Sequence, residues 1–253
     1  RIFKLILKFD LYMSRLHQKR TIHMYLPDDY LSYKKRYPVL YMFDGHNLFN
    51  DEDATYGKSW NLEQQIRWNH KELIVVGQEC SHDGNARLDE YGPWPFADEN
   101  FGIFEGKGEA TMHFFVEELK PYIDHHFPTL PDRDHTWIGG SSCGGLMAYF
   151  AGVFYSHIYS KSLVISPYFQ PVEEYLYWDT EKAYVHDGSC MYMSWGALEG
   201  GKHSFIRETK ICTELANKLI NKGVYIQFNV KPEGRHRESD WEKEASTFLN
   251  FLL

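Results

Sequence analysis

Hydrophobic residues in this chain fall into short apolar runs of strand length, separated by longer segments in which they recur with helical spacing. The strand-type runs occupy residues 3–11, 21–26, 38–43, 73–78, 135–138, 162–165, 191–195 and 224–230. The helical patterns occupy residues 112–126, 146–154, 205–221 and 239–252. Strands and helices alternate in the second half, as they do in parallel sheets with crossover helices. We therefore predict an α/β fold for residues 1–253, a single domain with a central, mostly parallel sheet of about eight strands flanked by helices.

Two features of the pattern depart from this alternation. The first two strand-type runs are separated by the polar residues 14–20, which predicts an antiparallel hairpin leading into the sheet. Residues 79–108 and 167–189 follow predicted strands and are rich in aromatic side chains. Because open α/β sheets bind ligands beyond the carboxyl ends of their strands, these segments are candidates for the walls or lid of a substrate pocket. The candidate substrate-binding aromatics are Trp94, Tyr168, Phe169 and Trp178.

The composition of the chain excludes some classes of binding partner. A net charge of −8 and a pI near 5.9 argue against binding to nucleic acid or to an anionic membrane surface. No apolar run approaches the roughly 18 residues of a membrane span, and the apolar start at residues 1–8 is too short for a signal peptide. We therefore expect a cytoplasmic protein with a small-molecule substrate. Its oligomeric state is open, a homodimer being one option.

The cysteines and histidines give no sequence signature of a metal or a cofactor. Cys80, Cys143, Cys190 and Cys212 lack the close pairing of a zinc site or a disulfide framework. Neighbours on a helix point to different sides, so the pair 125–126 is not expected to share a metal. We expect reduced thiols and neither a metal nor a cofactor.

Residues 139–145 read Gly-Gly-Ser-Ser-Cys-Gly-Gly and lie between a predicted strand and a predicted helix. A nucleophile held on a sharp strand-to-helix turn needs small residues two positions before and after it, because the backbone there is strained and closely packed. Only Ser142 has glycine at both positions, Gly140 and Gly144. Ser142 is therefore the candidate nucleophile.

A serine nucleophile requires an imidazole base, and a carboxylate that orients the base. His236 lies between the last predicted strand and the last helix, where the base of such a fold is expected. Glu199 follows the strand at 191–195 and is the favoured acid. The alternatives are Asp187, Glu238 and Asp240, or a Ser-His pair without a firm acid.

The oxyanion of a tetrahedral intermediate needs two preorganised N–H donors. One is expected from the backbone of Cys143, the residue after the nucleophile. The other is expected from the loop after the strand at 38–43, where Gly45 permits close approach and His46 or Asn47 offers its amide. We assign this backbone role to His46.

These motifs resemble those of the putative esterase family related to esterase D, enterochelin esterase and feruloyl or acetylxylan esterases. The resemblance rests on residues 41–49, 118–124, 139–147, 196–199 and 234–241 and extends from about residue 21 to the end of the chain. It implies an α/β-hydrolase fold and metal-free hydrolysis of carboxylic esters through an acyl-enzyme. Cys143 stands where the family usually has methionine.

Residues and resemblance together predict a serine carboxylesterase for small esters, among which aromatic and sugar-linked esters are favoured. Two alternatives remain at this point. An acyltransferase would pass the acyl group to a sugar hydroxyl rather than to water, and a binding protein would keep the fold without turnover. The presence of Ser142, Glu199 and His236 in the order of a hydrolase speaks against the second.

Overall fold

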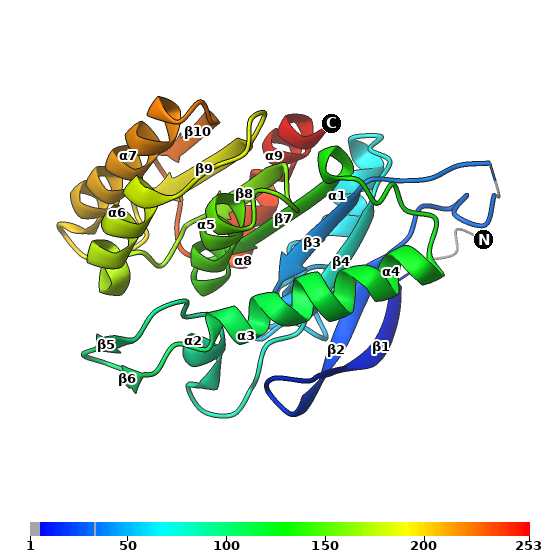
Figure 1. Cartoon of the computed structure of the whole chain (residues 1–253), viewed down its shortest axis with the longest axis horizontal. Coiled ribbons are helices and arrows are strands. Elements are labelled where there is room, and N and C mark those ends of the chain that lie inside the picture. The colour runs from blue at the N-terminus through cyan, green and yellow to red at the C-terminus, as the bar shows by residue number, and fades with distance from the viewer. Residues whose placement is uncertain (1–5, 33) are drawn as a thin grey trace.

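Eight strands form one sheet in the computed structural model, which describes residues 6–32 and 34–253 (Figure 1). The strands are β1 (Ile6–Met13), β2 (Gln18–Tyr25), β3 (Val39–Phe43), β4 (Ile74–Gln78), β7 (Thr136–Ser141), β8 (Lys161–Ile165), β9 (Cys190–Gly196) and β10 (Tyr225–Lys231). Their order is β1-β2-β4-β3-β7-β8-β9-β10. The pairs β1–β2 and β2–β4 are antiparallel and the others parallel, so the predicted mostly parallel sheet is confirmed.

The helices are α1 (Leu62–Trp68), α2 (Ala86–Glu90), α3 (Gly108–His113), α4 (Lys120–His126), α5 (Cys143–Phe154), α6 (Glu173–Lys182), α7 (Ser204–Asn221), α8 (Glu238–Lys243) and α9 (Ala245–Leu252). The predicted helix 112–126 comprises α3, a π-helical segment (Phe114–Leu119) and α4, which run on as one rod (Figure 1). The predicted helix 239–252 is divided between α8 and α9, with Glu244 at the junction. No helix in the described part of the chain is long and apolar enough to cross a membrane.

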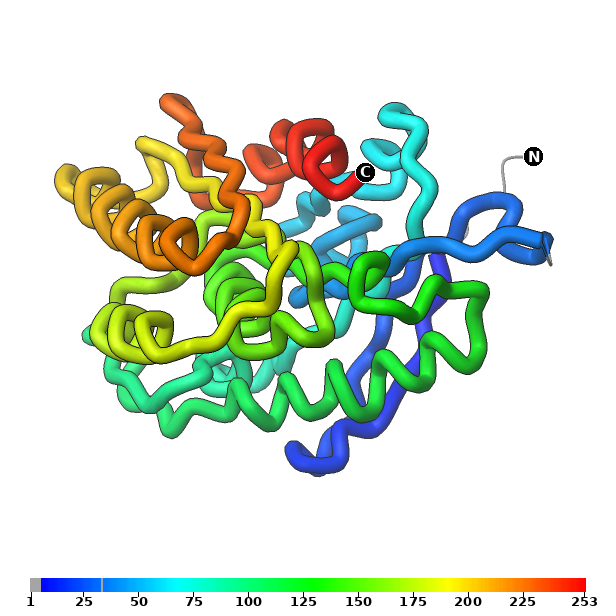
Figure 2. Tube along the Cα trace, turned by 45° about the horizontal axis from the view of Figure 1, so that its top comes forward, coloured from blue at the N-terminus to red at the C-terminus, as the bar shows by residue number. Residues whose placement is uncertain are grey.

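Both faces of the sheet are covered, as the run of apolar residues in the parallel strands requires. Along β3, Val39, Tyr41 and Phe43 join the core that contains residues of α3, α5 and α7. The alternate residues Leu40 and Met42 join a second core with α1 and α9. Helices α1 and α9 pack side by side on that second face (Figure 2).

Three details of the predicted elements differ from the structure. The hairpin turn is shorter than residues 14–20, because β2 already begins at Gln18. In the predicted run 3–11, residues 3–5 lie outside the described residues, and β1 continues to Met13. The predicted loops 79–108 and 167–189 contain structure of their own: α2 and the hairpin of β5 (Phe96–Asp98) and β6 (Gly102–Phe104) in the first, and α6 in the second.

Candidate active site

Ser142 occupies a sharp turn between β7 and α5, with φ 58° and ψ −121°. An L-residue is strained in that region, and such strain is found mainly at functional sites. A Cβ at position 140 would lie 2.5 Å from the carbonyl oxygen of Gly144, so glycine is needed there for the turn to close. The local geometry is that of a nucleophile elbow, in the register that the glycines indicate.

His236 and Glu199 approach each other from two loops at the carboxyl ends of neighbouring strands, β10 and β9. The His236 Nδ1–H donates to Glu199 Oε2 at 3.2 Å. The other oxygen, Oε1, accepts from the Gly196 N–H at 2.7 Å and the Ser166 hydroxyl at 2.5 Å. The Glu199 side chain is 1% exposed. The carboxylate is therefore held firmly, with one oxygen directed at the imidazole.

Trp241 supports both members of this pair. Its indole Nε1–H donates to Ser166 Oγ at 3.0 Å, and its ring lies edge-to-face on His236 with centroids 5.2 Å apart. A chain of hydrogen bonds thus runs from Trp241 through Ser166 to Glu199. Ser166 was not among the predicted site residues. It follows β8 in a constrained turn, with a positive φ of 44° that only the structure reveals.

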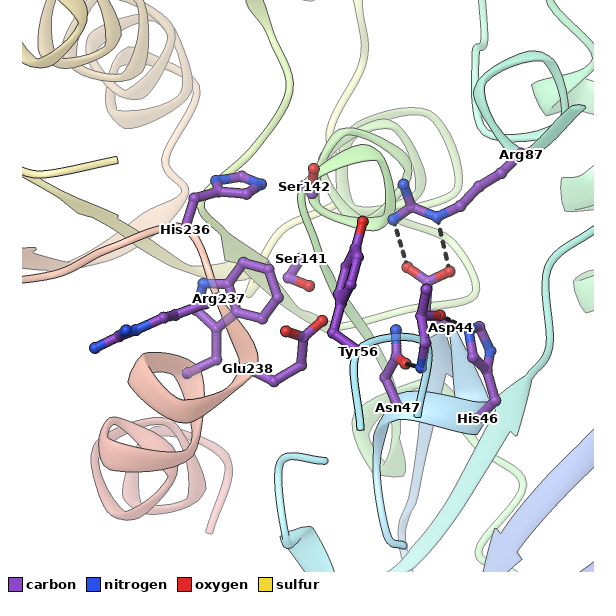
Figure 3. A pocket seen from close by; sticks show the side chains of 12 residues that line it. Asp44, His46, Asn47, Tyr56, Arg87, Ser141, Ser142, His236, Arg237 and Glu238 are labelled. Atoms are coloured by element: carbon purple, nitrogen blue, oxygen red, sulfur yellow. Dashed lines mark hydrogen bonds and ion pairs between the residues drawn. The ribbon is translucent and has the colours of Figure 1, made fainter. Parts of the chain in front are cut away.

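A cavity of about 400 Å³ contains Ser142 and His236 on one wall (Figure 3). Its other lining residues are Asp44, His46, Asn47, Thr55, Tyr56, Arg87, Ser141, Arg237, Glu238 and Trp241. Most of these side chains are polar or charged. The structure therefore gathers the candidate nucleophile, its candidate base and the candidate oxyanion loop around one small polar cavity.

The candidate oxyanion donors lie at two helix starts. Cys143 is the first residue of α5, and Gly45–Asn47 form a 3-10 helix directly after β3. The first N–H groups of a helix have no partner within it, so the amides of Cys143 and His46 can donate to a ligand. The alternative donor, the Asn47 N–H, already donates to the Asp44 carbonyl oxygen at 2.9 Å. A Cβ at position 45 would lie 2.3 Å from the Gly77 carbonyl oxygen, which explains the glycine. Burial raises the pKa of the Cys143 thiol, so this neighbour of Ser142 stays protonated.

Of the four candidate acids, the one that contacts His236 in the described structure is Glu199. Asp240 accepts from the Arg235 N–H at 2.7 Å and pairs with Lys243, which ties it to the start of α8. Asp187 precedes β9 and thus lies near the opposite end of that strand from Glu199. Glu238 lines the cavity, and burial raises the pKa of its carboxyl.

The aromatics expected to bind substrate are not among the residues that line this cavity. Trp94 donates to Asp179 at 2.8 Å and stacks on Tyr175, joining the 79–108 segment to α6. Phe169 is buried against Tyr149. Tyr168 and Phe169 line a separate small cavity, and Trp178 is 68% exposed on α6. Trp94 and Tyr168 join the two segments, Trp94 through Asp179 and Tyr175 and Tyr168 through Asp98 and Phe96.

A partly buried ion pair on the cavity wall was not predicted from the sequence. Arg87 donates to both carboxylate oxygens of Asp44, at 2.9 and 2.6 Å. Burial would raise the pKa of Asp44, but the adjacent Arg87 guanidinium holds it below its usual value. The two opposite charges of this pair offset each other on the cavity wall.

Glu208 on α7 is a partly buried carboxyl near the His236–Glu199 pair. Burial and the Glu199 charge raise its pKa from 4.5 to about 7, against the opposing effect of His236. The pKa of Glu208 is higher in the folded than in the unfolded state. The protonated carboxyl therefore contributes its full stability to the fold below pH 4.5, and this contribution is lost as the pH rises through about 7. We expect Glu208→Gln to increase the free energy of unfolding by about 1–2 kcal/mol more at pH 8.5 than at pH 4.5, allowing for solvent screening.

Urea denaturation at the two pH values measures this difference. Glu214→Gln, at an exposed position of the same helix, is the matched control and should change stability equally at both. An equal effect of Glu208→Gln at both pH values would contradict a raised pKa.

This chain is similar in sequence and in structure to several known proteins. A family model described as putative esterase matches residues 13–247. The uncharacterized protein YbbA of Bacillus subtilis is 27% identical over 210 residues, 81% of this chain and 79% of that protein. An IroE-like serine hydrolase from Shewanella oneidensis superposes with a TM-score of 0.76 at 18% identity, covering 97% of this chain and 80% of that one. A ferulic acid esterase superposes with a TM-score of 0.70 at 20% sequence identity, and the match covers 99% of this chain and 98% of that one. The predicted α/β-hydrolase fold is confirmed.

Proposed function

Because this chain belongs to the putative esterase family, we propose that it is a serine carboxylesterase that works through an acyl-enzyme. The observation that carries the proposal is the hydrogen bond from His236 to the buried Glu199, in a structure that also holds Ser142 on a strained turn in the same cavity. Neither a binding protein nor a scaffold requires that arrangement.

In this mechanism the Ser142 hydroxyl attacks the ester carbonyl carbon while His236 Nε2 accepts the hydroxyl proton. The amides of Cys143 and His46 stabilise the oxyanion of the tetrahedral intermediate. The C–O bond to the alcohol breaks, and the imidazolium returns the proton to the leaving alkoxide. Water then repeats the sequence on the acyl-enzyme, releasing the acid and regenerating Ser142.

The structure favours a small ester with polar substituents. The cavity of about 400 Å³ is bordered by Asn47, Tyr56, Arg237 and Glu238, which offer hydrogen bonds at several points. The aromatic residues that favoured an aromatic acyl group from sequence line other parts of the molecule. We therefore propose a short acyl group on a polar alcohol such as a sugar.

Two measurements test the function and the substrate class. We expect a fluorophosphonate to label the folded protein with one equivalent, located on the peptide that contains Ser142 by mass spectrometry. In a panel of acetyl, butyryl, octanoyl and feruloyl esters, kcat/KM should be highest for the short acyl groups. A well-folded protein that is neither labelled nor active on any ester would overturn the proposal.

The identity of the acid yields a separate prediction. We expect Glu199→Gln to lower kcat by about three to four decades, because an amide in place of the carboxylate no longer fixes the required imidazole tautomer. Steady-state hydrolysis of the best panel ester measures the loss. Asp187→Asn is the matched control and should change kcat less than about threefold. The reverse ranking of the two variants would move the acid role to Asp187.

A further inference from the structure

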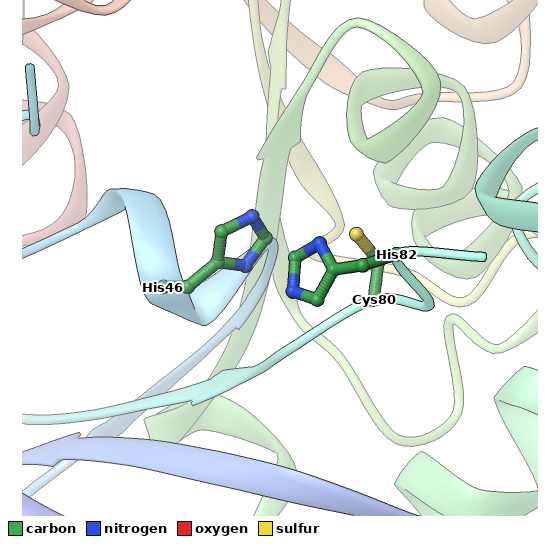
Figure 4. Close-up of side chains that lie close together, drawn as sticks. All are labelled: His46, Cys80 and His82. Carbon is green, nitrogen blue, oxygen red and sulfur yellow. The ribbon is translucent and has the colours of Figure 1, made fainter. Parts of the chain in front are cut away.

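His46, Cys80 and His82 meet behind the loop that follows β3 (Figure 4). Each offers one ligand atom, and these atoms all lie within 4.8 Å of one another. His46 and Cys80 are each 3% exposed, whereas His82 lies at the surface. The three residues come from the two loops that follow the parallel neighbours β3 and β4.

His46 presents a ring nitrogen with no protein partner. Its Nε2 is 3.0 Å from the Thr55 hydroxyl, whereas its Nδ1 is buried and has no hydrogen-bond partner among the described residues. Buried polar atoms are nearly always paired, so an orphan of this kind calls for a ligand or a water. The buried Nδ1 of His46 is therefore the ring nitrogen open to a ligand.

Glu79 orients the second histidine in the way that outer carboxylates orient metal-bound histidines. The His82 Nε2–H donates to Glu79 Oε1 at 2.6 Å, and the His23 Nε2–H donates to Oε2 at 2.7 Å. Burial would raise the pKa of Glu79, but these two hydrogen bonds lower it to about 2. The carboxylate thus stays ionised, and the His82 Nδ1 remains free to coordinate.

We propose that His46 Nδ1, Cys80 Sγ and His82 Nδ1 form a binding site for a divalent transition-metal ion of the zinc class. Two imidazoles and one thiolate are the borderline-soft donors that Zn²⁺ and Co²⁺ prefer, and water completes a tetrahedron. Tetrahedral bonds of about 2.0–2.3 Å place the ligand atoms roughly 3.3–3.8 Å apart, so the cluster must contract on binding. His82 is exposed and can supply that movement.

Binding has a defined proton balance. Coordination by Cys80 requires the thiolate. When the S–metal bond forms, the S–H bond breaks and one proton passes to solvent. A bound metal would also hold the His46 side chain in place. Because the His46 amide is a proposed oxyanion donor, metal binding would then affect ester hydrolysis, an effect that rests on the proposed function.

Titration with Co²⁺ tests the site without any ester substrate. We expect one equivalent to bind and to produce a near-ultraviolet thiolate-to-cobalt charge-transfer band, which one equivalent of Zn²⁺ should remove. Cys80→Ser should abolish the band, and His82→Ala should weaken Co²⁺ binding at least tenfold. The matched controls Cys190→Ser and His125→Ala lie elsewhere on the molecule and should bind as the wild type does.

Absence of the band in folded wild-type protein at pH 8 would overturn the proposal, as would a band that survives in Cys80→Ser. If Cys80→Ser fails to fold, the surface variant His82→Ala decides: unchanged Co²⁺ affinity would overturn the site. These readouts do not depend on hydrolysis, so an inactive protein that binds cobalt, or an active one that does not, separates this proposal from the esterase proposal.

Discussion

Ser142→Ala is expected to lower kcat for the best ester substrate by about five decades, because alanine leaves no nucleophile for the acyl-enzyme route. The residual rate would come from binding and from the oxyanion donors alone. Steady-state hydrolysis measures the loss, and active-site labelling should disappear with it. Alanine fits the elbow, where the side chain makes no cap hydrogen bond, so thermal unfolding should remain close to that of the wild type.

Ser141 provides a matched control for this prediction. It precedes Ser142, it also lines the cavity, and it is the last residue of β7. Ser141→Ala removes a hydroxyl from the same wall and should change kcat less than about tenfold. Activity that survives in Ser142→Ala and vanishes in Ser141→Ala would place the nucleophile one residue earlier and contradict the register inferred from the glycines.

The sequence was sufficient for the parts of the site that depend on chain order and local geometry. The elbow is encoded by Gly140 and Gly144, since a side chain at either would enter its neighbours. His236 and Glu199 were placed by their positions after successive strands, and the structure brings them within hydrogen-bond distance. In a parallel sheet the carboxyl ends of the strands share one edge, so such residues meet without any need for exact loop shapes.

The parts of the site that depend on long-range packing could not be predicted from the sequence. The Asp44–Arg87 pair joins the end of β3 to α2, 43 residues further along the chain, and the hydrogen bond from Trp241 to Ser166 spans 75 residues. Composition cannot distinguish an aromatic ring that lines a cavity from one that, like Trp94, joins two segments of the chain. The short helices α1, α2 and α6 were missed because few turns give little hydrophobic periodicity.

The His46, Cys80 and His82 cluster illustrates the same limit. Cys80 and His82 are two residues apart, but His46 belongs to the loop after another strand, and no metal-binding spacing is visible along the chain. Pairing of β3 with β4 brings the two loops together. The expectation of no metal rested on sequence spacing, whereas the proposed site rests on an orphan nitrogen that only the packing reveals.

His236→Ala is expected to lower kcat by about five decades, comparable to the loss in Ser142→Ala, because the two residues act as one unit in nucleophile activation. The double variant should therefore be no slower than either single variant, and kinetics of all three measure this non-additivity. The His236 side chain is 37% exposed, so added imidazole can enter the vacated space and should restore part of the activity of His236→Ala but none of that of Ser142→Ala.

His203→Ala, at an exposed position before α7, is the control for a general effect of losing a histidine and should leave kcat unchanged. The rival base within the cavity is His46, but its Nε2 faces Thr55 and its Nδ1 is buried, which leaves no ring nitrogen for the Ser142 hydroxyl. If His236→Ala kept most of its activity while His46→Ala lost it, the base would be His46, and Glu199 would have no catalytic partner.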